Sequence, residues 1–561
     1  ITDKVLDKEN GLSGRVYSMF KGNQYLMYVY KTYRDIRLVG APPESVGKFG
    51  GDTDNWEWPR HTGDFSIFRV YTAKDGKPAD YSRENVPLKP KYFLPVSIKG
   101  VKDGDYAMIY GYPGGTNRYE TSYGIKLKNE IENPSLVNLR AMRLKYMHAQ
   151  MIKDPAIKLK LANSYAGIAN YWKFFDGETK QLKKFHTYEQ KQDYEKNFQK
   201  WANGKPEFEN ILSDYEANYA AWTPYSKMRQ YTNEGIMGSP LAVYAASLIS
   251  LERELLKPGS KAEDIKKLAE IANKRRTAFL ENEDKPSDEK IVADAAMMFY
   301  QDIEKSQHPV GFYESLKNIF GSLDDEASFK KWAKNMFDST LIFNDSKWNS
   351  FIANPEANVL QSDPAYAYSS AFVQNYNTKY APLYAAFMNK NNELGMEYMK
   401  GIMQMNPAAA AKMYPDANFS MRVSYGSVKS YSPRDAVFYD YETTSKGILE
   451  KYIPGDYEFD LPAKQIELLK KKEFGQYMDK KRKDLVVGFI TTNDITGGNS
   501  GSPVMDGYGN LIGLAFDGNY EALSHKIAFD KDLNRTICVD VRYVLWCIDI
   551  LGGAKNIINE L

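Results

Sequence analysis

The stretch TGGNSGSPV at residues 496–504 places two serines between two apolar segments. LVVGFI precedes it at residues 485–490, and LIGLAF follows it at residues 511–516. Short apolar runs of this kind are typical of buried strands. DGYGN, at residues 506–510, has the composition of a tight turn, so we predict a β-hairpin that ends in LIGLAF. The serines are therefore expected on a bend inside an antiparallel sheet rather than in a linker.

The bend has two chemical interpretations. A turn of Gly, Asn and Ser can carry serines that only connect two strands. Alternatively, Ser500 is a nucleophile, because its own N–H and that of Gly498 have the spacing of donors that stabilise an oxyanion. Glycine at position 498 lets the N–H turn inward without a Cβ in the way. The strand-like flanks favour the second interpretation, with Ser502 as a bystander.

Composition excludes several classes of function. Lys and Arg total 74 against 72 acidic residues, a net charge of +2, which argues against a nucleic-acid or membrane-surface role. No apolar run approaches the roughly 18 residues that a membrane span needs, so no membrane insertion is expected. The two cysteines, Cys538 and Cys547, are predicted to be buried thiols, and we predict neither a metal nor a cofactor. Because the first residue is Ile1, we expect any targeting segment to lie outside the numbered chain.

The pattern along the chain changes twice. It is β-like to about residue 116, helical between about 124 and 415, and β-like again from about 419. We therefore predict one β domain interrupted by a helical insertion, and a final helix over residues 541–561. The predicted divisions are residues 1–117, 118–417 and 418–561.

A serine nucleophile also needs a base and an orienting carboxylate. Asp64 ends a polar and aromatic loop at the entrance to a predicted strand, where it is either that carboxylate or a capping aspartate after a turn. His61 lies only three residues earlier, which is too close to be oriented by Asp64 and also to reach a third segment. The other histidines are expected to be ordinary helix or surface residues or, for the last, part of a polar loop: His148, His186, His308 and His525.

Four motifs together resemble serine peptidase family 46, the dipeptidyl-peptidases 7 and 11 of Gram-negative bacteria. They are TGGNSGSPV, FGGDTDNWEWPRHTGDFS (49–66), IANYWK (168–173) and LAFDGNYEA (514–522), and the similarity spans nearly the whole chain. The resemblance implies an α+β multidomain fold, a chymotrypsin-like double β-barrel with a large inserted α-helical domain. It also implies release of N-terminal dipeptides from oligopeptides by a periplasmic homodimer.

The same resemblance assigns the catalytic residues. Ser500 matches the nucleophile, Asp64 matches the triad carboxylate, and the N–H groups of Gly498 and Ser500 match the oxyanion donors. In the family the catalytic histidine lies well upstream of this aspartate, whereas no histidine precedes His61 here. We therefore expect the base to lie outside the numbered chain.

Substrate-binding residues are also implied by the resemblance. Asn55, Trp56 and Asn170 match the residues that bind the free α-amine of the peptide. Amide oxygens and an aromatic face can hold an ammonium group without a fixed opposite charge.

Specificity is expected to depend on Gly518, with Phe516 and Asp517 in the same pocket wall. Acidic-specific members of the family carry arginine at the position of Gly518, so glycine implies a preference for a hydrophobic second residue. The alternatives are the acidic-specific type, an endopeptidase of the same fold, and a catalytically incomplete peptide-binding protein.

Overall fold

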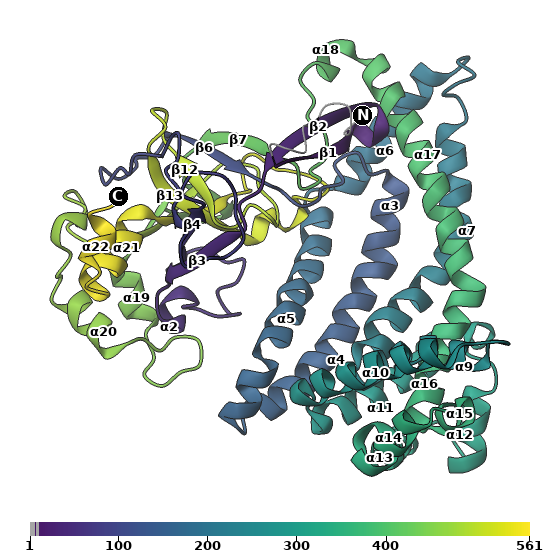
Figure 1. Ribbon diagram of the computed structural model, residues 1–561. Coiled ribbons are helices and arrows are strands. Elements are labelled where there is room, and N and C mark those ends of the chain that lie inside the picture. Colours follow the sequence, from purple (N-terminus) through teal and green to yellow (C-terminus); the bar gives the residue numbers. More distant parts are fainter. Residues whose placement is uncertain (1–5, 7–10) are drawn as a thin grey trace. The chain divides into compact units, whose positions relative to one another are not determined.

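The computed structural model describes residue 6 and residues 11–561, which form two compact units (Figure 1). Unit 1 comprises residues 1–120, 180–190 and 396–561, and unit 2 comprises residues 121–179 and 191–395. Both β-rich blocks of the sequence thus contribute to unit 1. The divisions at 117/118 and 417/418 remain predictions, and the start of the first one lies outside the described residues.

Unit 1 is organised around a seven-stranded sheet in which neighbouring strands are antiparallel. β6 comes from the first β-rich block and lies between two strands of the last one. In sheet order the strands are β10 (Glu442–Thr444), β11 (Val486–Thr491), β14 (Thr536–Asp540), β13 (Leu511–Gly518), β12 (Ser502–Met505), β6 (Tyr106–Gly111) and β7 (Arg422–Ser427).

The strands around the serine bend form as predicted. All six residues of β11 are buried, which explains its continuous apolar sequence. β12 and β13 form the predicted hairpin, with Ser502 opposite Ala515. Asp506 closes the turn, because its N–H donates to the carbonyl of Asn510 at 3.0 Å and its carboxylate accepts the N–H of Tyr508. The bend is therefore held between two strands of one sheet.

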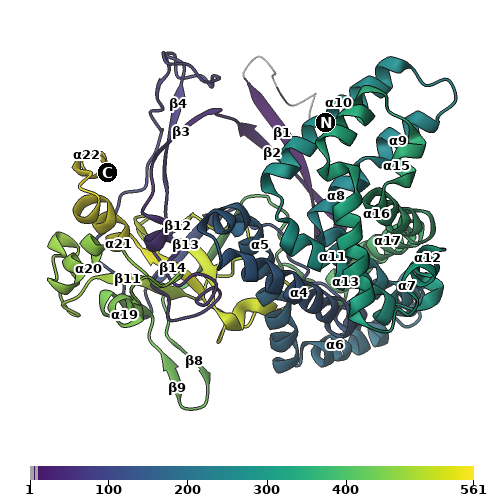
Figure 2. The ribbon, with the colours of Figure 1, turned by 90° about the horizontal axis from the view of Figure 1, so that it is seen from below.

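The prediction of a double β-barrel is not confirmed, because the described strands form four sheets and no closed barrel. The seven-stranded sheet does approach closure: an isolated bridge joins Val428, just after β7, to Thr491 at the end of β11. The other sheets are β1 (Leu12–Met19) with β2 (Gln24–Lys31), β3 (Asp35–Gly40) with β4 (Ile67–Thr72) and β5 (Val86–Pro87), and the projecting hairpin of β8 (Tyr431–Arg434) and β9 (Val437–Tyr439) (Figure 2).

The helices of unit 1 are short, and the prediction of one final helix over 541–561 is wrong. α21 is followed by a π-helical turn, and the chain then leaves the helix at Gly552 and Gly553. Gly553 has a φ of +69°, a left-handed conformation that ends helices. The helices are α2 (Glu44–Gly47), α18 (Pro407–Ala410), α19 (Ser445–Lys451), α20 (Ala463–Lys470), α21 (Val541–Trp546) and α22 (Lys555–Ile558).

Unit 2 is helical, as the 3.6-residue periodicity predicts, and its core is rich in aromatic side chains. α5, α6 and α17 each continue into residues assigned to unit 1. The helices are α3 (Ser122–Leu127), α4 (Asn133–Met151), α5 (Pro155–Lys184), α6 (Thr187–Ala202), α7 (Ile211–Gln230), α8 (Pro240–Ser247), α9 (Ile249–Leu256), α10 (Ala262–Asn282), α11 (Lys285–Asp302), α12 (Phe312–Phe320), α13 (Glu326–Ser339), α14 (Asp345–Ala353), α15 (Ala357–Ser362), α16 (Pro364–Asn375) and α17 (Ala381–Met405).

Cys538 and Cys547 are free, buried thiols, as predicted. Burial raises the pKa of both, so neither is a reactive thiolate at neutral pH. No single helix among the described residues is long and apolar enough to cross a membrane; by length and composition alone, one sharply bent pair, Ile211–Gly238 with Pro240–Leu256, meets those criteria together.

Candidate active site

The bend before β12 has a shape that only glycine permits at position 498. Gly498 has a φ of +106°, and a Cβ there would lie 2.4 Å from the carbonyl oxygen of Tyr112. The neighbouring Gly497 carbonyl accepts the N–H of Gly114 at 2.7 Å. The segment after β6 therefore supports the bend. A side chain at position 498 would force this segment and the bend apart.

The N–H groups of Gly498 and Ser500, the predicted oxyanion donors, have no acceptor among the described residues. The residues that follow each of them are bonded: Asn499 donates to the carbonyl of Thr496 at 3.0 Å, and Gly501 donates to that of Ala515 at 2.8 Å. Buried backbone donors normally find a partner within the protein, whereas Gly498 and Ser500 are exposed, so their N–H groups are open to a ligand. Two N–H groups without acceptors beside an exposed serine can together bind the oxygen of a substrate carbonyl.

The Ser500 side chain is exposed and points toward β13. Its hydroxyl donates to the carbonyl oxygen of Phe516 at 3.3 Å, a long and therefore weak hydrogen bond. Ser502, by contrast, is buried at the start of β12. Of the two serines in the motif, Ser500 is the one that an incoming substrate can reach.

None of the five histidines, all within the described residues, hydrogen-bonds to Ser500. His61 is buried with its Nδ1 unpaired. Burial, with the nearby charges of Lys451 and Arg60, lowers the pKa of His61 to about 3. The ring also packs directly over Gly447, where a Cβ would overlap it. His61 is thus a neutral core residue and not a base for the serine.

His525 has a different role: it lies in the connection between β13 and β14, as predicted, but its side chain is buried. The short 3-10 helix η10 (Tyr520–Ser524) leads into it, and its ring is buried beneath the bend. Its Nε2 hydrogen-bonds to the Thr496 hydroxyl at 2.9 Å, and its Nδ1 bonds to the carbonyl of Ala522. Burial lowers the pKa of His525 to about 4, so it supports the bend as a neutral group. Sequence reasoning missed this role because histidine and threonine are 29 residues apart.

Asp64 lies three residues before β4 with its side chain exposed. No backbone N–H in the described chain donates to its carboxylate, so the alternative of a capping aspartate gains no support. The crowding of nearby protein atoms raises the pKa of Asp64, the positive charge of Arg60 opposes that rise, and the negative charge of Asp517 adds to it. Asp64 is therefore close enough to interact electrostatically with Asp517 on β13, the strand whose Phe516 carbonyl accepts the Ser500 hydroxyl. Its exposed carboxylate can also bind a further side chain.

The DNW segment packs onto the predicted specificity wall. The N–H of Trp56 donates to Asp517 Oδ2 at 3.1 Å, and Trp56 adopts a φ of +60°, which is unusual for a side chain of this size. A Cβ at Gly518 would lie 3.4 Å from the Trp56 ring and 3.4 Å from Ala522. The structure thus brings Trp56, Asp517 and Gly518 together at the end of β13.

Arg60 holds this arrangement, a role that no local pattern in the sequence indicates. Its guanidinium donates to Asp517 Oδ2 at 2.8 Å, to the carbonyl of Asp54 at 2.7 Å and to the Thr62 hydroxyl at 2.6 Å. The Arg60 and Asp517 side chains are 10% and 9% exposed. Asp517 Oδ1 accepts the N–H of Gly518 at 2.9 Å. Asp517 is therefore a neutralised, fully bonded carboxylate that fixes the wall.

Two further contacts anchor the same loop within unit 1. Lys451 bonds to the Asp54 carboxylate at 2.7 Å, and Glu458 accepts the N–H of Asp52 at 2.7 Å. Asn55 lies between these anchors and Trp56, whereas Asn170 belongs to α5 in unit 2. The roles of Asn55 and Asn170 remain predictions.

A comparison with protein families decides the assignment, because the model of the peptidase S46 family matches residues 1–561. The chain belongs to the peptidase S46 family. An Asp/Glu-specific dipeptidyl-peptidase of Flavobacterium psychrophilum is 41% identical to this S46 protein, over 99% of this S46 chain and 76% of the relative. A dipeptidyl-peptidase 7 of Capnocytophaga gingivalis is 40% identical over 99% of this chain and 77% of the relative.

A solved structure agrees with this assignment. The crystal structure of Porphyromonas endodontalis DPP11 in complex with the dipeptide Arg-Glu matches the S46 chain with a TM-score of 0.88 and 31% identity. The match covers 99% of this chain and 78% of that one. The two sequence relatives have different names at almost equal identity, and only the first name states a specificity. Identity alone therefore does not assign a substrate preference to this S46 protein.

Proposed function

We propose that this S46 protein is a serine exopeptidase that releases dipeptides from the N-termini of oligopeptides. The observation that carries the proposal is the pair of unpaired N–H groups at Gly498 and Ser500, beside the one exposed hydroxyl of the motif. Membership of the S46 family and the names of its dipeptidyl-peptidase relatives support the same reaction.

In this reaction Ser500 Oγ attacks the carbonyl carbon after the second residue of the peptide. The carbonyl oxygen becomes an oxyanion between the N–H groups of Gly498 and Ser500, where each donor is worth about 3 to 4 kcal/mol in the transition state. Asp64 is the carboxylate available to orient the base that takes the serine proton. The acyl-enzyme formed with Ser500 is then hydrolysed by water to release the dipeptide.

Recognition of a free α-amine would limit the product to a dipeptide. We assign it to Asn55 and Trp56 in the loop that Arg60 anchors, and to Asn170 on α5. A substrate held by its ammonium group presents its second peptide bond to Ser500, so the position of this loop sets the product length. Peptides with an acetylated N-terminus are expected to be poor substrates, and equal cleavage of acetylated and free peptides would contradict this assignment.

A hydrophobic second residue is the preference that the wall favours. Residues 516–518 present no cation, and the carboxylate of Asp517 is already bonded to Arg60. A buried Asp or Glu side chain of the substrate would lose its hydration without gaining a partner, at a cost of several kcal/mol. An apolar side chain would gain about 1.5 to 3 kcal/mol from burial in the same place.

Gly518→Arg tests this preference. Gly518 is outside the left-handed region and a Cβ there makes only ordinary contacts, so the backbone accepts the substitution. Turnover of dipeptide reporters with Leu, Phe, Asp or Glu at the second position is expected to shift toward Asp and Glu. Gly507→Arg, in the β12–β13 turn, adds the same charge elsewhere and is expected to leave the preference unchanged. Faster cleavage after Asp or Glu by the unmodified protein would favour the acidic-specific type instead.

We also infer a chymotrypsin-like barrel in unit 1, built from β11, β14, β13, β12, β6 and β7. The support is the connection between the ends of β7 and β11: the N–H of Thr492 donates to the carbonyl of Ser427 at 2.9 Å, and that of Lys429 donates to the carbonyl of Ile490 at 3.3 Å. An experimental structure in which these two strand ends separate would contradict the barrel. The periplasmic location and the homodimer remain proposals based on family resemblance, tested by fractionation and by mass in solution.

A further inference from the structure

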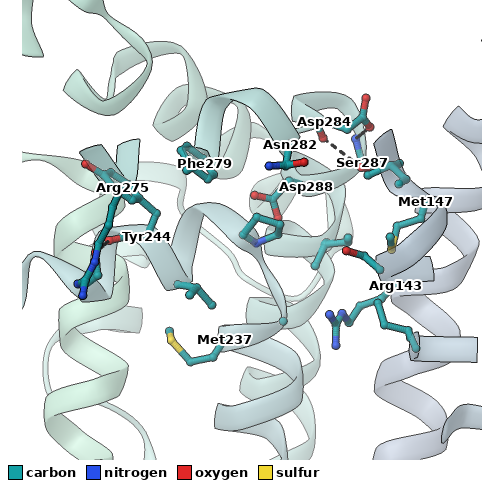
Figure 3. A pocket seen from close by; sticks show the side chains of 18 residues that line it. Arg143, Met147, Met237, Tyr244, Arg275, Phe279, Asn282, Asp284, Ser287 and Asp288 are labelled. Carbon is teal, nitrogen blue, oxygen red and sulfur yellow. Dashed lines mark hydrogen bonds between the residues drawn. The ribbon is translucent and has the colours of Figure 1, made fainter. Parts of the chain in front are cut away.

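Unit 2 contains a cavity of about 620 Å³ between its helices (Figure 3). α4, α5, α8, α10 and α11 line it, together with the short 3-10 helix η5 (Ile236–Gly238). The volume falls within the range of about 300 to 1,000 Å³ that is usual for small-molecule sites. All the lining residues belong to unit 2, whereas Ser500 belongs to unit 1. Nothing in the proposed reaction uses this cavity.

Most of the cavity wall is apolar. Met147 and Leu161 contribute to it from α4 and α5, Met237 from η5, and Phe279 and Ile291 from α10 and α11. Methionine side chains adapt to ligands of different shape. This wall is suited to the side chains of a small apolar molecule.

Asp288 is an acidic group of the wall that has no ion-pair partner among the described residues. Asp288, on α11, is only 1% exposed and lines the cavity, as Figure 3 shows. Its Oδ2 accepts the N–H of Leu241 at 2.9 Å, but its Oδ1 has no donor in the described chain. Both carboxyl oxygens of nearby Glu283 are also buried without a donor. Burial raises the pKa of both groups, and the hydrogen bond between the two carboxyl groups lets a protonated Glu283 donate to Asp288. The pair therefore keeps a negative charge that has no ion-pair partner among the described residues.

One basic group in the wall is also available. Arg275, on α10, lines the cavity with an exposed side chain and makes no hydrogen bond or ion pair within the described residues. The other arginine of the wall, Arg143, is already paired with Glu234 at 3.2 Å. The cavity thus combines a buried acceptor, an accessible cation and an apolar wall.

We propose that this cavity binds a small zwitterion with apolar side chains, of the class of amino acids and dipeptides with both ends free. The ammonium group supplies the positive charge that Asp288 lacks, and the carboxylate pairs with Arg275. A simple amine would leave Arg275 without a partner, and a simple carboxylic acid would leave Asp288 without one. The link to the dipeptide products of the reaction rests on the proposed function, whereas the binding itself does not.

Calorimetry with the dipeptide Leu-Leu tests this site, with N-acetyl-Leu-Leu and Leu-Leu amide as probes of the two ends. We expect a saturable site that Arg275→Gln weakens by about tenfold or more, the usual effect of losing one charged contact. Lys274→Gln removes the same charge from the neighbouring exposed position, which does not line the cavity, and is expected to leave binding unchanged. Capping either end of the dipeptide is expected to weaken binding to a similar extent.

A second pair of variants tests the acidic end. Asp288→Asn is expected to weaken the contact with the ammonium group and to leave the contact between the carboxylate and Arg275 unchanged. Leu-Leu and Leu-Leu amide are therefore expected to lose affinity by a similar factor. Asp294→Asn, a buried carboxylate on the same helix that bonds to Tyr146 and lies outside the cavity wall, is the matched control. Met237→Trp fills the cavity and is expected to abolish binding with any dipeptide.

Leu-Leu binding that neither Arg275→Gln nor Met237→Trp changes would overturn the proposal. The absence of saturable binding up to about 10 mM would also overturn it, because most specific sites have dissociation constants far below that concentration. Dipeptide that binds near Ser500 would appear as a separate class of sites, unaffected by Arg275→Gln. Because turnover is not measured, failure of the peptidase assignment would leave this test intact.

Discussion

Arg60→Met should destabilise unit 1 far more than an exposed charge deletion. The substitution keeps much of the side-chain length but removes all three hydrogen bonds of the guanidinium. It leaves Asp517, which is 9% exposed, without its cation. Removing one partner of a buried ion pair typically costs about 3 to 5 kcal/mol, because the remaining charge is left uncompensated.

Denaturant unfolding of the Arg60→Met protein, followed by tryptophan fluorescence, measures this cost. Arg34→Met is the matched control, because Arg34 pairs with Asp80 at 2.6 Å but both side chains are largely exposed. Such exposed pairs contribute about 1 kcal/mol or less. The double variant Arg60→Met with Asp517→Leu should recover stability relative to Arg60→Met alone, because no charge is then buried unpaired.

The same substitution has a functional consequence. Trp56 and Gly518 are held together through Asp517, so loss of Arg60 is expected to raise KM for free-amine peptides and to weaken discrimination at the second residue. A loss of stability below about 1 kcal/mol, equal to that of Arg34→Met, would refute the reasoning that this pair fixes the wall.

Two further predictions concern the serine bend. Gly498→Ala is expected to reduce kcat by about 100-fold or more with little change in KM, because a Cβ 2.4 Å from the Tyr112 carbonyl must displace an oxyanion donor; unchanged kcat would contradict that role. The free energy of unfolding is expected to fall as pH drops from 6.5 toward 4. In that range His525 is protonated in the unfolded chain but stays neutral in the folded chain, where burial lowers its pKa to about 4. His525→Gln should show a smaller fall over that range, and an identical pH profile for the two proteins would show that His525 does not contribute.

Local patterns in the sequence predicted much of the fold. The buried strand β11, the β12–β13 hairpin and the long helices α4, α10 and α17 all follow from hydrophobic periodicity and turn composition. The prediction of one final helix was wrong because the apolar repeat continues past Gly552 and Gly553. At these residues the helix ends through the backbone conformation and not through a change in side-chain pattern.

Contacts between distant segments could not be predicted in the same way. The position of β6 between β12 and β7 depends on pairing across more than 300 residues. Arg60 with Asp517 and His525 with Thr496 are likewise joined only by the fold. A single sequence shows that a buried carboxylate needs a cation, but it does not show which arginine supplies it.

The central claim is that Ser500 is the nucleophile, and covalent labelling of the intact protein with a fluorophosphonate tests it most directly. Mass spectrometry of the digested protein is expected to find one adduct, on Ser500. The adduct should be absent from Ser500→Ala and retained in Ser502→Ala, the neighbouring buried serine. An adduct on Ser502, or labelling that persists in Ser500→Ala, would contradict the account.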